Sequence, residues 1–143
     1  MTIRTVEFAP RYLPTRYQDV DIDGVYLMPI NNPTGRTLPP EQLRAFVDTV
    51  LDRWPHAGII LDSVYVRLHP RYRDLLAWYE ENPRYAEAVL IIDSLSKTHG
   101  VTGLRSGAIL TRSSRLRDGI VRYAQNIMGW SRICSPHHGL QWE

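Results

Sequence analysis

The sequence predicts an α/β fold in which helices cover both faces of a mainly parallel sheet. Four short segments are apolar throughout, a pattern typical of strands that are buried on both faces. Segments with the 3.6-residue periodicity of amphipathic helices alternate with them along the chain. The composition, 43% hydrophobic and 22% charged over 143 residues, is that of an ordinary globular domain that can bury its own core.

The first predicted strand and the first predicted helix stand on either side of a turn. GVYLMPI at 24–30 is a compact apolar run, and the turn sequence NNPTG closes it. The helix begins with Pro39 and Pro40 in its first turn and Glu41 near the positive end of its dipole. Pro55 ends the helix. The apolar residues of the helix fall on one face: Leu43, Phe46, Val47, Val50, Leu51 and Trp54.

Three more strands and two more helices continue the alternation. AGIILD at 57–62 and VLIID at 89–93 are the next buried strands, and SGAILT at 106–111 is the fourth. A helix over 71–81 is predicted between the second and third strands, ended by an Asn-Pro pair. The last helix spans 114–128. Its apolar side is formed by Leu116, Ile120, Ala124 and Ile127.

The composition also excludes several classes of protein and site. The net charge is only +2 and the arginines are scattered, so nucleic acid is not an expected partner. Cys134 is the single cysteine, which excludes an internal disulfide and a cysteine metal cluster, and we expect no metal. Apolar runs such as 88–92 are far too short to span a membrane, and the first residues lack the apolar core of a signal peptide. We therefore expect a cytoplasmic protein with no membrane partner.

Polar residues follow three of the predicted strands directly. They are Asn31 and Asn32 after the first strand, Asp62 at the end of the second, and the segment 93–97 after the third. In open parallel sheets, ligands bind beyond the carboxyl ends of the strands. The predicted topology therefore brings these residues together as a candidate site.

Each of these residues also has an ordinary structural explanation. The NPTG sequence is a turn former, and Asp62 could merely cap the next helix. Tyr65 could be a half-buried aromatic residue, and Ser94 and Ser96 could simply begin a helix. Taken one at a time, the residues favour neither explanation, so the whole set has to be considered.

Lys97 is the only lysine in a chain with 17 Lys and Arg residues. A lysine, unlike an arginine, can lose its proton and act as a nucleophile. Pyridoxal phosphate needs such a lysine for a Schiff base, an acid beside its pyridine nitrogen, and donors for its phosphate. Candidates for the other contacts are Asp62 for the acid, Tyr65 and Asn32 for the phenolic oxygen of the ring, and Ser94 and Arg105 for the phosphate.

Three motifs occur in one order along the chain. N-P-x-G occupies 32–35 and D-x-x-Y occupies 62–65. SLSKTHGVTGLRSG at 94–107 fits S-x-[ST]-K followed by G-x-x-G-x-R-x-G. In these three motifs, in their order and in the separations between them, nearly the whole chain resembles the class I/II aminotransferases, a family of fold-type I pyridoxal phosphate enzymes. One departure is Ser63, which stands where the family often has Glu.

The resemblance implies a role for each matched residue. Lys97 would form the Schiff base with pyridoxal phosphate and move the proton at the substrate's α-carbon. The other implied contacts are Asp62 with the pyridine nitrogen, Asn32 and Tyr65 with the phenolic oxygen, and Ser94 and Arg105 with the phosphate, where Ser96 is a lesser candidate. A homodimer is implied as well, since fold-type I enzymes generally place their sites at a subunit interface.

The expected function is therefore that of a pyridoxal phosphate-dependent aminotransferase acting on an amino acid and a 2-oxo acid. The same lysine and aspartate would also serve decarboxylation, elimination, cyclisation or oxidation, so these reactions stay open. A third possibility is a truncated, non-catalytic remnant that binds a partner chain.

The length of the chain is its main departure from the family pattern. We expect residues 1–143 to form a single, incomplete cofactor-binding large domain. The glycine- and serine-rich phosphate turn that precedes this region in the family is not found in the sequence, and neither is the C-terminal small domain. A complementing chain is therefore expected as an alternative to a homodimer.

Overall fold

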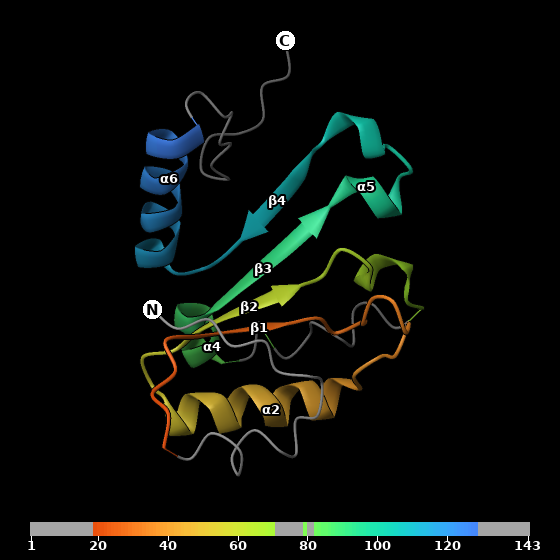
Figure 1. The fold of residues 1–143 in the computed structure, drawn as a ribbon. Helices are drawn as coiled ribbons and strands as arrows, with labels where there is room; N and C mark the ends of the chain where they lie inside the picture. The colour runs from red at the N-terminus through yellow and green to blue at the C-terminus, as the bar shows by residue number, and fades with distance from the viewer. Residues whose placement is uncertain (1–18, 71–78, 80–81, 129–143) are drawn as a thin grey trace.

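A four-stranded sheet forms the centre of the computed structural model, which describes residues 19–70, 79 and 82–128 (Figure 1). The strands lie in the order β1-β2-β3-β4, with bounds Gly24–Leu27, Gly58–Asp62, Val89–Ser94 and Gly107–Leu110. β1, β2 and β3 run parallel to one another, while β4 runs antiparallel to β3. The predicted α/β class and the mainly parallel sheet are confirmed.

Two strands have features that the apolar pattern did not predict. β1 ends at Leu27 rather than continuing to residue 30, and Pro29, which follows shortly after, has no N–H to donate to a sheet. β4 returns antiparallel because the chain between β3 and β4 holds only two short helical pieces, α5 (Leu95–Thr98) and η3 (Thr102–Leu104). A parallel return needs a longer crossover, usually a full helix.

Helix α2 (Pro40–Arg53) covers one face of the sheet (Figure 1). Leu27, Leu61 and Ile91 are cross-strand neighbours, so their side chains lie on one face, and all three are buried. The predicted apolar face of the helix belongs to the same core cluster. Its buried residues are Leu43, Phe46, Val47, Val50 and Leu51.

The opposite face of the sheet is also apolar, but it is much more exposed. Tyr26 pairs with Ile60, and Ile92 pairs with Ile109, which puts these four side chains on that face. Tyr26 is 57% exposed, Ile60 36% and Ile109 50%. The described residues thus bury the α2 face of the sheet more completely than the face that carries Tyr26.

Short helices begin where the sequence suggested interruptions. The Asn82-Pro83 pair begins α4 (Pro83–Ala88), because the Asn82 side chain accepts a hydrogen bond from the N–H of Arg84 at 2.9 Å. Proline is favoured at the first position of a helix, where no N–H is needed. The predicted helix over 71–81 lies outside the described residues except for Tyr79. The last predicted helix is present as α6 (Ser114–Met128).

Gly107, the first residue of β4, is expected to tolerate no side chain. A Cβ atom there would lie 2.8 Å from the carbonyl oxygen of Asp93 on the neighbouring strand. Gly107→Ala should therefore lower the free energy of unfolding by about 1–3 kcal/mol, because the backbones of β3 and β4 would have to separate. Urea denaturation measures this change, and Gly103→Ala is the matched control, since a Cβ at Gly103 meets open space. Equal midpoints for the two variants would contradict the close approach.

Candidate active site

The carboxyl ends of β1, β2 and β3 meet at one edge of the sheet, because these strands are parallel and paired in register. β4 starts at the same edge, where Gly107 pairs with Ser94. The segments that adjoin these strand ends carry all of the predicted site residues. They lie on the right-hand side of Figure 1, around α5 and the turn that follows β2.

Asp62, the last residue of β2, is half-buried and accepts a hydrogen bond on each carboxylate oxygen. The N–H of Val64 donates to Oδ1 at 3.2 Å, and the hydroxyl of Tyr26 donates to Oδ2. The first contact is a local turn typical of aspartate, whereas the second comes from the neighbouring strand. Sequence reasoning missed Tyr26 as a partner of Asp62.

Tyr65 and Lys97 bring the second and third motifs into contact. Tyr65 is half-buried at the start of η2 (Val66–Leu68), and Lys97 is exposed on α5. The Nζ atom of Lys97 lies 5.8 Å from the centroid of the Tyr65 ring, a distance at which an ammonium is attracted to the face of an aromatic ring. The lysine and the aspartate of the predicted site therefore belong to adjoining segments.

Ser94 acts as the N-cap of α5, which is the ordinary explanation considered for it above. Its hydroxyl oxygen accepts a hydrogen bond from the N–H of Ser96 at 3.2 Å. The same hydroxyl donates to the carbonyl oxygen of Ser106 at 3.2 Å. Ser94 thus links the beginning of the lysine segment to the strand that returns beside it, and Ser96 is half-buried next to it.

Arg105 has an unusual backbone conformation for a residue with a side chain. Its φ is +49°, and among the described residues it is the one non-glycine with a positive φ. Such residues occur at functional sites more often than elsewhere. Its guanidinium makes one long contact, 3.4 Å, to the carbonyl oxygen of Thr102, which leaves most of its donors available.

Asn32 lies in the turn that follows β1, and the structure does not bring its side chain onto the other candidates. The turn is closed by a hydrogen bond from Gly35 N–H to the carbonyl oxygen of Asn31 at 2.8 Å. Gly35 has a φ of +68°, which explains the glycine of the NPTG motif. The Asn32 side chain is exposed and makes no hydrogen bond within the described part of the chain.

An ion pair that the sequence did not reveal joins the segment after β2 to the end of β3. Arg67, in η2, donates from Nε to Asp93 Oδ2 at 2.6 Å, and Asp93 stands on β3 just before the lysine motif. The Asp93 side chain is only 13% exposed, while that of Arg67 is 46% exposed. The other oxygen of Asp93 accepts from the N–H of Ser94 at 2.8 Å. Asp93 therefore ties the segment after β2 to the start of the lysine segment.

Removing this ion pair is expected to destabilise the chain modestly. We expect a coupling free energy between Arg67→Gln and Asp93→Asn of about 0.5–1 kcal/mol, discounted for the exposure of the arginine. A double-mutant cycle on urea unfolding measures it. The control is the Arg84–Asp52 pair, 2.7 Å apart and more exposed on its carboxylate side, whose coupling should be smaller. If the coupling free energy of Arg67–Asp93 is no larger than that of the control pair, the ion pair does not stabilise the contact between the two segments.

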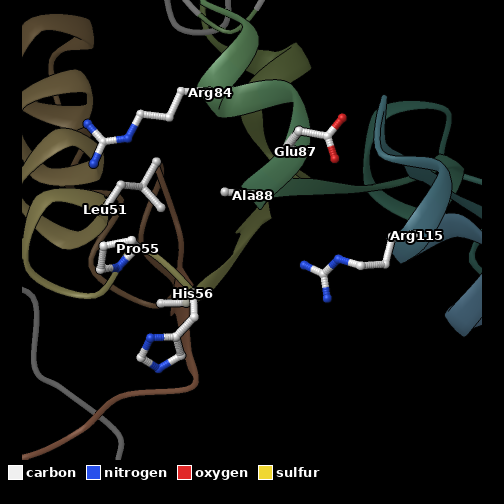
Figure 2. Close-up of a pocket in the computed structure, with 8 residues that line it drawn as sticks. Leu51, Pro55, His56, Arg84, Glu87, Ala88 and Arg115 are labelled. Carbon is white, nitrogen blue, oxygen red and sulfur yellow. The ribbon is translucent and has the colours of Figure 1, made fainter.

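The structure also contains a cavity of about 240 Å³ (Figure 2). It is lined by residues that precede β2 and β3, among them His56 and Ala88, and by Arg115 at the start of α6. These positions belong to the amino ends of the parallel strands, opposite the edge that carries Asp62 and Lys97. None of the predicted site residues lines this cavity.

The described residues contain neither a candidate metal site nor a candidate membrane-spanning helix. No group of three or more His, Cys, Asp or Glu side chains in the described ranges could hold a metal ion. No helix in these same ranges is long and apolar enough to cross a membrane.

The family was determined by comparison with known proteins. The family model described as aminotransferase class I and II matches residues 4–138. The chain belongs to this family. The resemblance carried by the three motifs is thereby confirmed, and it extends over almost the entire length of this aminotransferase-family chain.

Curated relatives of this aminotransferase-family chain bear the names of two kinds of aminotransferase. It is 38% identical over 78 residues to an aromatic amino acid aminotransferase of Mycobacteroides abscessus, covering 54% of the chain and 20% of the relative. It is also 38% identical over 89 residues to histidinol-phosphate aminotransferase 1 of Thiobacillus denitrificans, covering 61% of the chain and 21% of the relative. The chain thus spans about a fifth of the length of these two relatives.

Solved structures of aminotransferases share the fold. Aminotransferase AspB of Helicobacter pylori matches with a TM-score of 0.62 and 32% identity, covering 81% of this chain and 30% of that one. A pyridoxal phosphate-bound putative aminotransferase from Clostridium difficile matches with a TM-score of 0.71, covering 84% of this chain and 30% of that one. At 16% identity, the second likeness supports the fold alone.

Proposed function

We propose that this chain forms the pyridoxal phosphate-binding part of an aminotransferase that acts on an amino acid and a 2-oxo acid. The observation that carries the proposal is the contact between two motifs at the carboxyl edge of the sheet. The amine of Lys97, the only lysine, lies 5.8 Å from the centroid of the Tyr65 ring. Tyr65 comes three residues after Asp62 in the sequence. A nucleophilic amine and a carboxylate at one sheet edge are what pyridoxal phosphate requires.

The donors and acceptors of these residues fit the cofactor. An ionised carboxylate offers about four acceptor positions, and Asp62 uses two of them, so it can still accept from a pyridinium N–H. The amine of Lys97 forms no ion pair within the described residues. The guanidinium of Arg105 keeps free donors that can bind a phosphate in a bidentate manner.

The proposed roles follow from these capacities. When bound, pyridoxal phosphate supplies an electron-poor ring that accommodates charge from a bond broken at the substrate's α-carbon. Lys97 Nζ would hold the cofactor covalently until a substrate amine displaced it, and the freed amine would then take the proton from the α-carbon. Asp62 would keep the ring nitrogen protonated by accepting its hydrogen bond. The remaining proposed contacts are Tyr65 and Asn32 with the phenolic oxygen, and Ser94, Ser96 and Arg105 with the phosphate. Ser94 has one O–H, so it would have to turn that donor from the Ser106 carbonyl to the phosphate.

We favour transamination over the other reactions of this cofactor because the chain belongs to the aminotransferase family. The lysine and the aspartate would serve decarboxylation or elimination equally well. The structural neighbours include an L-threonine-O-3-phosphate decarboxylase of Porphyromonas gingivalis, but at 21% identity this likeness concerns the fold alone.

We further propose that the residues described form part of a larger site. The chain spans 20% of one curated relative and 30% of the AspB structure, so groups that hold the substrate are expected in a further segment or in a second chain. The exposed face that carries Tyr26, Ile60 and Ile109 supports this proposal, because a contiguous apolar face is usually covered in a working protein.

A spectroscopic titration tests the cofactor assignment directly. Purified chain should give a saturable absorbance change with pyridoxal phosphate, at one cofactor per chain. Pyridoxal without its phosphate should bind more weakly, because the contacts of Ser94 and Arg105 would be lost. Addition of an amino acid should then reverse the change if the chain, alone or with a partner, catalyses amino transfer. No saturable change at all would contradict the proposed function.

A further inference from the structure

Tyr26 and Asp62 lie on the same face of two neighbouring parallel strands. Tyr26 of β1 pairs with Ile60 of β2, and Asp62 comes two residues after Ile60. Side chains two residues apart on a strand point to the same face, so Tyr26 and Asp62 are diagonal neighbours across the strand pair. A tyrosine is long enough to span this diagonal, and its hydroxyl donates to Asp62 Oδ2.

We infer that Tyr26 is a positioning residue that orients the Asp62 carboxylate toward the ring nitrogen of the cofactor. This inference rests on the proposed function, because it assigns Tyr26 to a contact that Asp62 makes there. Tyr26 itself touches no reacting atom in this assignment.

The two hydrogen bonds of Asp62 fix its carboxylate from both sides. Val64 N–H holds Oδ1 from within the same segment, and Tyr26 holds Oδ2 from the adjacent strand. Because each oxygen has its own donor, the carboxylate cannot rotate without breaking one of these bonds. Without Tyr26, a single bond at Oδ1 would leave the group free to turn about it. A fixed acceptor loses less conformational entropy when it binds a ligand.

Tyr26 stays a hydrogen-bond donor throughout the neutral and mildly alkaline range. Partial burial, the hydrogen bond to Asp62 and the negative charge of that carboxylate raise the pKa of Tyr26 to about 12. Because the folded pKa lies above the ordinary value of 10.0, the stability that the protonated hydroxyl contributes is complete below pH 10. That contribution is lost as the pH rises through 12.

Packing requirements do not account for the tyrosine hydroxyl at this position. The residue is 57% exposed, so a phenylalanine would fit and the hydroxyl could otherwise be satisfied by water. The hydroxyl nevertheless faces the carboxylate that the proposed function assigns to the cofactor. Phenylalanine at position 26 therefore removes the proposed role while leaving the ring in place.

A double-mutant cycle on cofactor affinity tests the inference. Tyr26→Phe should weaken the binding of pyridoxal phosphate by about threefold to tenfold, the loss of one hydrogen bond to a partly exposed charged group. In an Asp62→Asn background, the same change should alter the affinity by less than about twofold, because Tyr26 acts through Asp62. Tyr123→Phe on the exposed side of α6 is the matched control, and it should leave the affinity unchanged.

Tyrosine titration in the protein without cofactor gives a second readout. In Asp62→Asn the pKa of Tyr26 should fall below its wild-type value of about 12, because the negative charge of Asp62 and its hydrogen bond are lost, while burial still holds the pKa above 10.0. NMR of ring-labelled tyrosine measures this, and the Tyr26→Phe spectrum assigns the signal. This readout tests the hydrogen bond itself, since a tyrosine whose hydroxyl did not bind Asp62 would not respond to Asp62→Asn; the double-mutant cycle on cofactor affinity tests the positioning role.

The outcomes separate the inference from the proposed function. A wild-type chain that binds no pyridoxal phosphate overturns the proposed function, and the role of Tyr26 falls with it. A chain that binds the cofactor but is indifferent to Tyr26→Phe overturns the inference alone. The inference is also overturned if Tyr26→Phe weakens binding equally in the wild-type and the Asp62→Asn backgrounds.

Discussion

Replacing Lys97 with arginine is expected to abolish covalent binding of pyridoxal phosphate at the candidate site. Lys97 is the only lysine, so the variant removes every side-chain amine from the chain. Arginine keeps the positive charge above the Tyr65 ring, but its guanidinium stays protonated and is no nucleophile. The free energy of unfolding should therefore stay within about 0.5 kcal/mol of the wild type, while the absorbance band that borohydride removes disappears.

A relocated lysine is the sharpest control for this experiment. Arg115→Lys in the Lys97→Arg background restores one lysine at the far end of the sheet, beside the cavity in Figure 2. This double variant has the same composition as the wild type, and it should remain without the band. Recovery of the band would mean that any exposed amine reacts, and it would contradict a specific role for Lys97.

Asp62→Asn is expected to weaken the binding of pyridoxal phosphate by about 10- to 100-fold. The neutral amide keeps the size of the side chain but loses the negative charge that would stabilise a protonated ring nitrogen. A hydrogen bond to a charged group contributes about 1.5–3 kcal/mol, which corresponds to this range of affinity. Absorbance titration measures the change. Asp118→Asn, the same chemical change on α6, should have no effect. Equal affinities for wild type and Asp62→Asn would contradict the proposed contact.

Much of the fold was predictable because its elements carry strong local signals. The apolar runs that became β2 and β3 are short and uninterrupted, and α2 has both a continuous apolar face and a proline just beyond its end. The short elements were not predictable in the same way. α4 begins at Asn82-Pro83, where the sequence suggested only an end, because an Asn-Pro pair can serve either purpose.

The residues of the candidate site that lie at strand ends were predictable from the sequence. Asp62 and Ser94 close parallel strands, so their convergence at one edge follows from topology. The partners of these residues depend on strand register, which the apolar pattern does not specify. Tyr26 therefore went unnoticed beside Asp62, although alternation along β1 and a known register would have placed it there. Arg67 likewise has no sequence feature that distinguishes it from the other arginines.

The pairing of Ser94 with Gly107 makes residues 95–106 a loop whose two ends are fixed on adjacent strands. Lys97 and Arg105 stand near opposite ends of that one loop. If Lys97 binds the cofactor as proposed, the bound ligand would meet Arg105 at an effective concentration set by this short closed loop rather than by solution, typically in the millimolar range. The contact with Arg105 could then be individually weak and still strengthen binding, and the ligand would connect the two ends of the loop.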